Sequence, residues 1–183
     1  MPTPKIKLAA LALVCLVLGA PSAGSASTPT KPEIISGPAS STNARDATIS
    51  FTSPPDAVSF TCTLDDLAPE SCMSPWTHSS LAEGSHSFSV QAEDGVSTSE
   101  PAPWTWTVDL TSPSLPDDKT VEATSPLGTA VSFSATDNFD PHPDLSCSPS
   151  SGSLFDLGPP ASVDCTATDA AGNQSSGSFT VTG

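Results

Sequence analysis

The sequence predicts an all-β protein that consists of two small β-sandwich domains in tandem. Apolar residues alternate with Ser and Thr along several short segments, which is the pattern of strands with one buried and one exposed face. The 183 residues include 20 Pro and 11 Gly, which disfavours long helices and favours turns. An internal repeat between the two halves indicates that the chain divides into two similar units.

Four alternating segments define the first domain, which we predict at residues 32–111 after a flexible leader at 27–31. Their apolar positions are Ile49 and Phe51, then Val58, Phe60, Cys62 and Leu64, then Phe88, Val90 and Ala92, and finally Trp104, Trp106 and Val108. The pattern breaks at residues 111–113, so we place the domain boundary near Ser112.

The second domain, predicted at residues 112–183, contains four further segments. They are residues 120–123, then Val131, Phe133 and Ala135, then Val163, Cys165 and Ala167, and finally Phe179 and Val181. The repeat supports the division, because positions 88, 90, 92, 94, 104 and 106 correspond to 163, 165, 167, 169, 179 and 181, each shifted by 75 residues. We therefore expect the last hairpin of each domain to be the same structural unit.

Residues 1–26 have the pattern of a secretory signal peptide. Lys5 and Lys7 precede an apolar run at residues 8–20, which is too short to span a bilayer comfortably. We expect cleavage after Ala26, with Ala23 as the alternative, and we interpret Cys15 as part of the apolar run. The protein is thus expected to be secreted and extracellular, with no membrane insertion after cleavage.

Charge and cysteine content narrow the possible partners. A net charge of −15 disfavours binding to nucleic acid or to anionic lipid surfaces. Four cysteines follow the leader, and three pairings of them are possible. We favour Cys62–Cys72 and Cys147–Cys165, because each bridge closes a short loop within one predicted domain. Their spacing does not match that of zinc ligands.

The second half resembles a known family of extracellular domains. Its carriers are residues 114–123 (SLPDDKTVEA), 133–138 (FSATDN), 145–158 (LSCSPSSGSLFDLG), 163–173 (VDCTATDAAGN) and 179–181 (FTV). Together they resemble the HYR (hyalin repeat) family. The resemblance implies an immunoglobulin-like β-sandwich, a Cys147–Cys165 bridge, a part in cell adhesion and no catalytic residues.

The first half resembles a bacterial immunoglobulin-like repeat of secreted and surface proteins. The carriers are residues 60–65 (FTCTLD), 72–75 (CMSP), 81–88 (LAEGSHSF) and 104–109 (WTWTVD). Where that repeat usually has Gly after the Asp, this chain has Asp66. The fold class expected for the whole chain is thus all-β, with two tandem immunoglobulin-like sandwiches after a signal peptide.

Nothing in the sequence predicts an enzyme or a resident cofactor. His78, His86 and His142 lie in different segments, and no Ser lies in a nucleophile elbow. Two loops are rich in side chains that could hold Ca²⁺, and their members are Asp137, Asn138, Asp140, Asp144, Asp169 and Asn173. Because Asp and Asn are also the ordinary residues of turns, we favour turn chemistry and predict no metal ligands or cofactors.

We therefore expect a secreted, non-catalytic structural or adhesion module that binds an extracellular protein or surface component. The alternative is a secreted carbohydrate-binding protein, because Trp side chains can stack on sugar rings. Trp104 and Trp106 alternate with Thr as core residues do, which leaves Trp76 as the tryptophan free to be exposed. We favour core or edge packing of the tryptophans over sugar binding.

Overall fold

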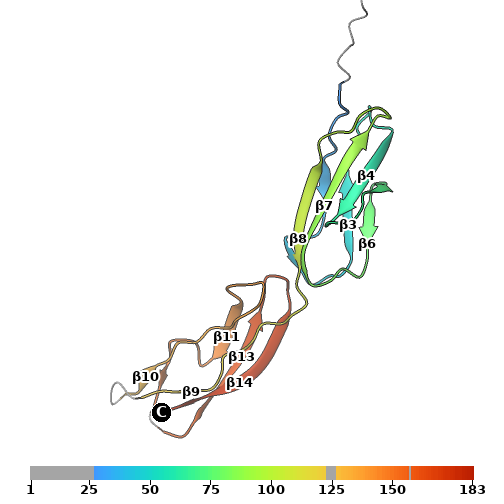
Figure 1. The fold of residues 1–183 in the computed structure, drawn as a ribbon. Coiled ribbons are helices and arrows are strands. Elements are labelled where there is room, and N and C mark those ends of the chain that lie inside the picture. Colours follow the sequence, from blue (N-terminus) through green and yellow to red (C-terminus); the bar gives the residue numbers. More distant parts are fainter. Residues whose placement is uncertain (1–26, 123–126, 157) are drawn as a thin grey trace, which may run out of the picture.

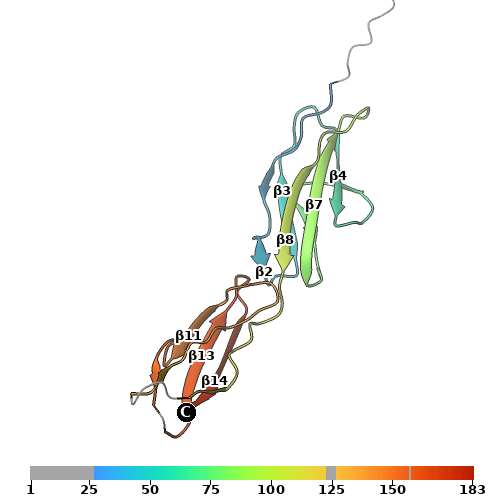
Figure 2. The ribbon, with the colours of Figure 1, turned by 60° about the vertical axis from the view of Figure 1, so that its left-hand side comes forward.

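Strands make up all of the regular structure in the described part of the chain. The computed structural model describes residues 27–122, 127–156 and 158–183, so the predicted signal peptide lies outside the described residues. Figures 1 and 2 show two groups of strands that lie end to end. None of the described residues belongs to a helix with the length and apolar character that crossing a membrane requires. The all-β prediction is confirmed.

Fourteen strands are described, and they form four sheets. Their bounds are β1 Ile34–Ser36, β2 Ser41–Thr42, β3 Ala47–Phe51, β4 Ser59–Leu64, β5 Glu70–Cys72, β6 Trp76–His78, β7 Gly84–Glu93, β8 Ala102–Val108, β9 Lys119–Thr120, β10 Thr129–Ala130, β11 Asp144–Ser148, β12 Leu154–Phe155, β13 Ala161–Thr168 and β14 Gln174–Thr182.

The N-terminal half is built from a five-stranded sheet, β2-β8-β7-β4-β5, and a three-stranded sheet, β1-β3-β6. Side chains of both sheets meet in one apolar core, for example Trp76 of β6 and Phe88 of β7, whose ring centroids are 4.6 Å apart. In β7 the buried residues Phe88, Val90 and Ala92 alternate with less buried ones, as the sequence pattern predicts. Two sheets that share a core in this way are compatible with a β-sandwich.

The C-terminal half contains a four-stranded sheet, β11-β13-β14-β9, and the pair β10-β12. Its core is smaller and shares no residue with the first. Phe133 packs edge-on against Phe179 at a centroid distance of 4.9 Å, and Val163 is fully buried beside them.

The repeated hairpin has the same register in both halves. In the antiparallel pair β7–β8, Phe88 lies opposite Trp104, and in β13–β14 Val163 lies opposite Phe179. Each partner in the second pair is 75 residues beyond its counterpart, which agrees with the shift read from the sequence. In each half a short early strand also pairs in parallel with the last strand, β2 with β8 and β9 with β14.

The segment at residues 131–135 differs from its prediction. Val131, Phe133 and Ala135 are buried and alternate with exposed residues, yet the segment is not part of a sheet. The reason is that Phe133 hydrogen-bonds to a side chain instead of a strand: its N–H donates to Ser151 Oγ, and the Ser151 hydroxyl donates to its carbonyl, both at 2.9 Å. Alternation therefore predicts the buried face correctly, whereas the strand predicted from it is not formed at these residues.

Candidate functional site

Three carboxylates meet where the two halves adjoin. Asp109 directly follows β8, Asp137 follows the bridge residue Thr136, and Asp169 directly follows β13. One carboxylate oxygen from each lies within 4.8 Å of the others. The positions of the strand ends explain this convergence, because β8 ends and the β13–β14 turn begins at the same junction. We call these three residues the junction carboxylates.

Asp109 is the most enclosed of the three, with an exposed fraction of 0%. Its backbone N–H donates to the Thr42 carbonyl at 2.9 Å, which fixes the end of β8 against the end of β2. Its Oδ1 accepts the N–H of Thr111 at 3.1 Å, whereas its Oδ2 is buried and has no hydrogen-bond partner among the described residues. A buried carboxylate oxygen without a donor is costly, so this atom requires an explanation.

Asp137 and Asp169 are held by the backbone of their own turns. Asp137 Oδ1 accepts the N–H groups of Phe139 and Asp140, each at 2.9 Å, and its Oδ2 is also buried without a partner among the described residues. Asp169 Oδ1 accepts the N–H of Asn173 at 2.8 Å. Backbone N–H groups of each turn thus bind one oxygen of each carboxylate and hold the side chain in place.

Asn173 connects the halves directly. Its Nδ2 donates to the carbonyls of Asp109 at 2.9 Å and Thr111 at 3.2 Å, and to Asp169 Oδ2 at 2.9 Å. On another side of the junction, Glu83 Oε1 accepts the Thr111 hydroxyl at 2.6 Å and the Asn138 amide at 3.1 Å. The connection between the halves is therefore polar and built from turn residues.

The junction carries negative charge without a neighbouring positive side chain among the described residues. Burial raises the pKa of Asp109 most strongly; the N–H of Thr111 opposes this, and the carboxylates of Asp137, Asp169 and Glu83 raise the pKa further. Hydrogen bonds from Thr111 and Asn138 lower the pKa of Glu83. Within the described ranges, the ion pair found is His86–Asp65, so no Lys or Arg compensates the junction carboxylates there.

The loop residues considered as Ca²⁺ ligands in the sequence analysis differ in whether they reach the junction. Asp137, Asp169 and Asn173 reach the junction, as described above. Asp140 instead accepts the N–H groups of His142 and Ala170, each at 2.9 Å, and Asp144 begins β11 with an exposed side chain. Asp109 was missed as a site residue, although it ends the quoted run at residues 104–109, because alternation alone does not show which strand ends meet.

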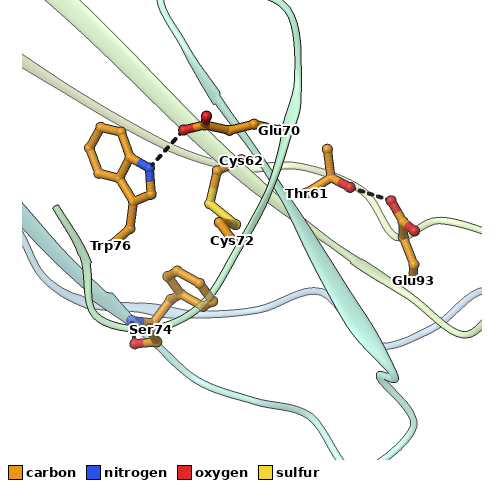
Figure 3. Close-up of a disulfide and its surroundings, with 8 residues drawn as sticks. Thr61, Cys62, Glu70, Cys72, Ser74, Trp76 and Glu93 are labelled. Carbon is orange, nitrogen blue, oxygen red and sulfur yellow. Dashed lines mark hydrogen bonds between the residues drawn. A yellow bond between two sulfur atoms is a disulfide. The ribbon is translucent and has the colours of Figure 1, made fainter. Parts of the chain in front are cut away.

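Both disulfides lie away from this junction site and within single halves. Cys62 of β4 is bonded to Cys72 of β5, and Cys147 of β11 is bonded to Cys165, its direct cross-strand partner in β13. Figure 3 shows the first bridge beside Trp76, whose Nε1 donates to Glu70 at 3.4 Å. Cys62 and Cys165 are 1% and 5% exposed, so each bridge joins the core to an edge strand.

The tryptophans do not form an exposed platform. Trp76 is only 6% exposed and stacks on His78 at a ring centroid distance of 5.7 Å, which agrees with the favoured expectation of core or edge packing and not with an exposed sugar-binding platform. The buried position follows from β6, which turns Trp76 inward against β7. Trp106 is 3% exposed, and the partly buried Trp104 donates to the carbonyl of Pro38 at 3.2 Å.

The side chain of His86 serves packing and local hydrogen bonds. His86 lies in β7 with Nδ1 2.9 Å from Asp65 Oδ2 and Nε2 2.9 Å from the Ala82 carbonyl. Burial lowers the pKa of His86, but the contacts with Ala82 and Asp65 together outweigh it, so its pKa is raised. His86 also packs beside Trp106 at a centroid distance of 5.5 Å, and both line a shallow surface hollow with Ser and Thr neighbours.

One comparison with known protein families finds a match in the C-terminal half. A family model described as "HYR domain" matches residues 108–183. These residues are similar to the HYR domain. The match supports the resemblance carried by residues 114–181 and includes all three junction carboxylates. The likeness of residues 32–111 to a bacterial immunoglobulin-like repeat stays a prediction.

The chain was also compared with curated proteins and with solved structures. No curated protein matches the chain. Among solved structures, the chain is similar to one titled "Structure of surface layer protein SbsC, domains 1-6", with 18% sequence identity and a TM-score of 0.25. That match covers 83% of this chain and 26% of the other, so the chain spans about a quarter of its length.

Proposed function

We propose that this protein is a secreted, non-catalytic structural or adhesion module made of two tandem immunoglobulin-like domains, at residues 32–111 and 112–183. The observation that carries the proposal is the HYR domain match over residues 108–183. The all-β architecture and the two disulfides support it, because bridges of this kind form in oxidising, extracytoplasmic compartments.

The arrangement of the halves suits a spacer or adhesive rod. Each half has its own core, and the two lie end to end, so the chain presents a long surface for its size (Figure 2). The partner we propose is an extracellular protein or surface component. The carbohydrate-binding alternative depends on an exposed Trp76, and this side chain packs in the core.

Fractionation and binding to intact cells test this proposal. The native protein should be found outside the cell and begin near Ser27. Fluorescently labelled protein should bind the surface of the producing cells in a saturable way, and excess unlabelled protein should compete. Reduced and alkylated protein is the control and should bind less, because its domains lose their bridges. Recovery of the protein from the cytoplasm, or surface binding that neither saturates nor is competed, would contradict the proposal.

A further inference from the structure

The junction between the two halves contains more negative charge than its hydrogen bonds satisfy. Three carboxylates supply oxygens within 4.8 Å of one another, and the described residues place no Lys or Arg against them. Carboxylates at this separation repel each other strongly where water is excluded. Such a group is stabilised either by protons or by a cation.

The buried carboxylate oxygens favour a cation over protons as the group that stabilises the junction. Asp109 has an exposed fraction of 0%, and its Oδ2 has no donor among the described residues; Asp137 Oδ2 is in the same position. The other oxygen of each accepts backbone N–H groups, which hold the side chain in place whether or not its charge is compensated. Two fixed carboxylates, each with one buried and unpartnered oxygen, that lie within reach of a third are what a bound cation requires.

We propose that Asp109, Asp137 and Asp169 bind one Ca²⁺ ion that joins the two halves. Ca²⁺ lies about 2.3–2.6 Å from its oxygen ligands, so ligands of one ion lie no more than about 5 Å apart, as these do. The ligand set contains oxygen alone, which disfavours Zn²⁺. Three carboxylates on separate turns suit the irregular coordination of Ca²⁺ better than the octahedral geometry of Mg²⁺, which usually uses one or two carboxylates.

The consequence is a cation-dependent hinge. Asp109 directly follows β8, whereas Asp137 and Asp169 belong to turns of the C-terminal half. An ion held by all three would therefore restrict the angle between the halves. Without the ion, the connection would rest on the polar contacts of Asn173 and Glu83. This inference does not depend on the partner or on the adhesive role proposed above.

Calcium titration of the purified, disulfide-bonded protein tests the site. After removal of metal with EDTA, isothermal titration with CaCl₂ should show one ion per chain, and the thermal transition should move upward with CaCl₂ but much less with MgCl₂. Small-angle scattering should give a narrower distribution of interatomic distances with Ca²⁺. Absence of a calcium heat would mean that protons alone stabilise the carboxylates, and equal shifts with both ions would mean that the junction does not select Ca²⁺. Either result would overturn the proposal.

Matched variants make the test specific. Asp137→Asn keeps the oxygen that accepts Phe139 and Asp140, yet removes the charge, and should weaken Ca²⁺ binding at least tenfold. Asp94→Asn is the control, because Asp94 Oδ1 accepts the N–H groups two and three residues ahead in the same way, at 2.8 and 2.7 Å, at the opposite end of the β7–β8 hairpin. The Ca²⁺ affinity of the Asp94→Asn variant should stay within twofold of wild type. Equal losses of Ca²⁺ affinity in both variants would refute the assignment.

A second variant separates cation binding from simple loss of structure. Asp109→Asn should abolish the calcium response while its thermal transition in EDTA stays equal to or above that of wild type, because a buried charge has been removed. A variant with lower stability in EDTA and an unchanged response to Ca²⁺ would show that Asp109 is structural and not a ligand.

Discussion

The side chain of Asn173 donates a 2.9 Å hydrogen bond to the backbone carbonyl of Asp109, 64 residues earlier in the chain. The same Nδ2 also reaches the carbonyl of Thr111. One amide group of the β13–β14 turn thus fixes the segment that connects the two halves.

Asn173→Ala should loosen this connection without unfolding either core. Loss of a net hydrogen bond of about 1.4 kcal/mol corresponds to about tenfold faster local opening. Cleavage by thermolysin beside Leu110, measured under native conditions, should accelerate by that order. Gln174→Ala is the control, since that side chain bonds Thr168 within its own hairpin at 3.2 Å. Equal cleavage rates in both variants would contradict the role of Asn173.

Removing the Cys147–Cys165 bridge should destabilise only the C-terminal half. The bridge closes a loop with a sequence separation of 18, for which the expected loss is roughly 2–4 kcal/mol. The double variant Cys147→Ala/Cys165→Ala avoids a free thiol. Calorimetry should show one transition lowered and the other unchanged.

The matched variant Cys62→Ala/Cys72→Ala should lower the other transition, because that bridge lies in the N-terminal core. If either double variant lowered both transitions to the same extent, the two cores would not unfold independently.

Ser151→Ala should destabilise the C-terminal half more than the small size of the removed hydroxyl suggests. The hydroxyl is both acceptor and donor for the backbone of Phe133, so its removal leaves two polar groups unpaired beside a buried ring. The expected loss in the free energy of unfolding is about 1–3 kcal/mol, measured by urea denaturation of the C-terminal half. Ser150→Ala, at an exposed position that contacts Ser153 at 3.3 Å, should change it little. A neutral Ser151→Ala would show that Phe133 finds another partner.

The stability of the N-terminal half should fall as pH rises above neutrality through a contribution of His86. Its folded pKa is raised, so this contribution is fully present below the unfolded value of about 6.5 and is lost as pH rises through the folded pKa. The urea midpoint of wild type minus that of His86→Gln should therefore decrease between pH 6 and pH 8. A difference that is constant, or that increases with pH, would show that His86 does not gain a proton on folding.

The sequence was informative where a pattern depends on one strand. Alternation in residues 88–92 and 163–167 identified the buried faces, since side chains two apart necessarily share a side of a sheet. The repeat identified the equivalent hairpins, because Phe88–Trp104 and Val163–Phe179 keep one register.

Features that depend on long-range placement were less accessible. The alternation of residues 131–135 is that of a strand, but the partner of Phe133 is the hydroxyl of Ser151. Asp137 and Asp169 stood out as turn residues, yet their meeting with Asp109 depends on which ends of two sheets adjoin. Trp76 follows a Ser-Pro pair typical of an exposed turn, and only the position of β6 shows that it packs inward.

The parallel pairing of β2 with β8, and of β9 with β14, determines how the protein responds to mechanical tension. In each half, the early strand and the final strand lie side by side and point the same way. A pull on the two ends of a half therefore slides these strands past each other, and the hydrogen bonds between them carry the load together instead of opening one after another. The parallel pairs that link an early strand to the last strand of each half are thus arranged to resist force in shear.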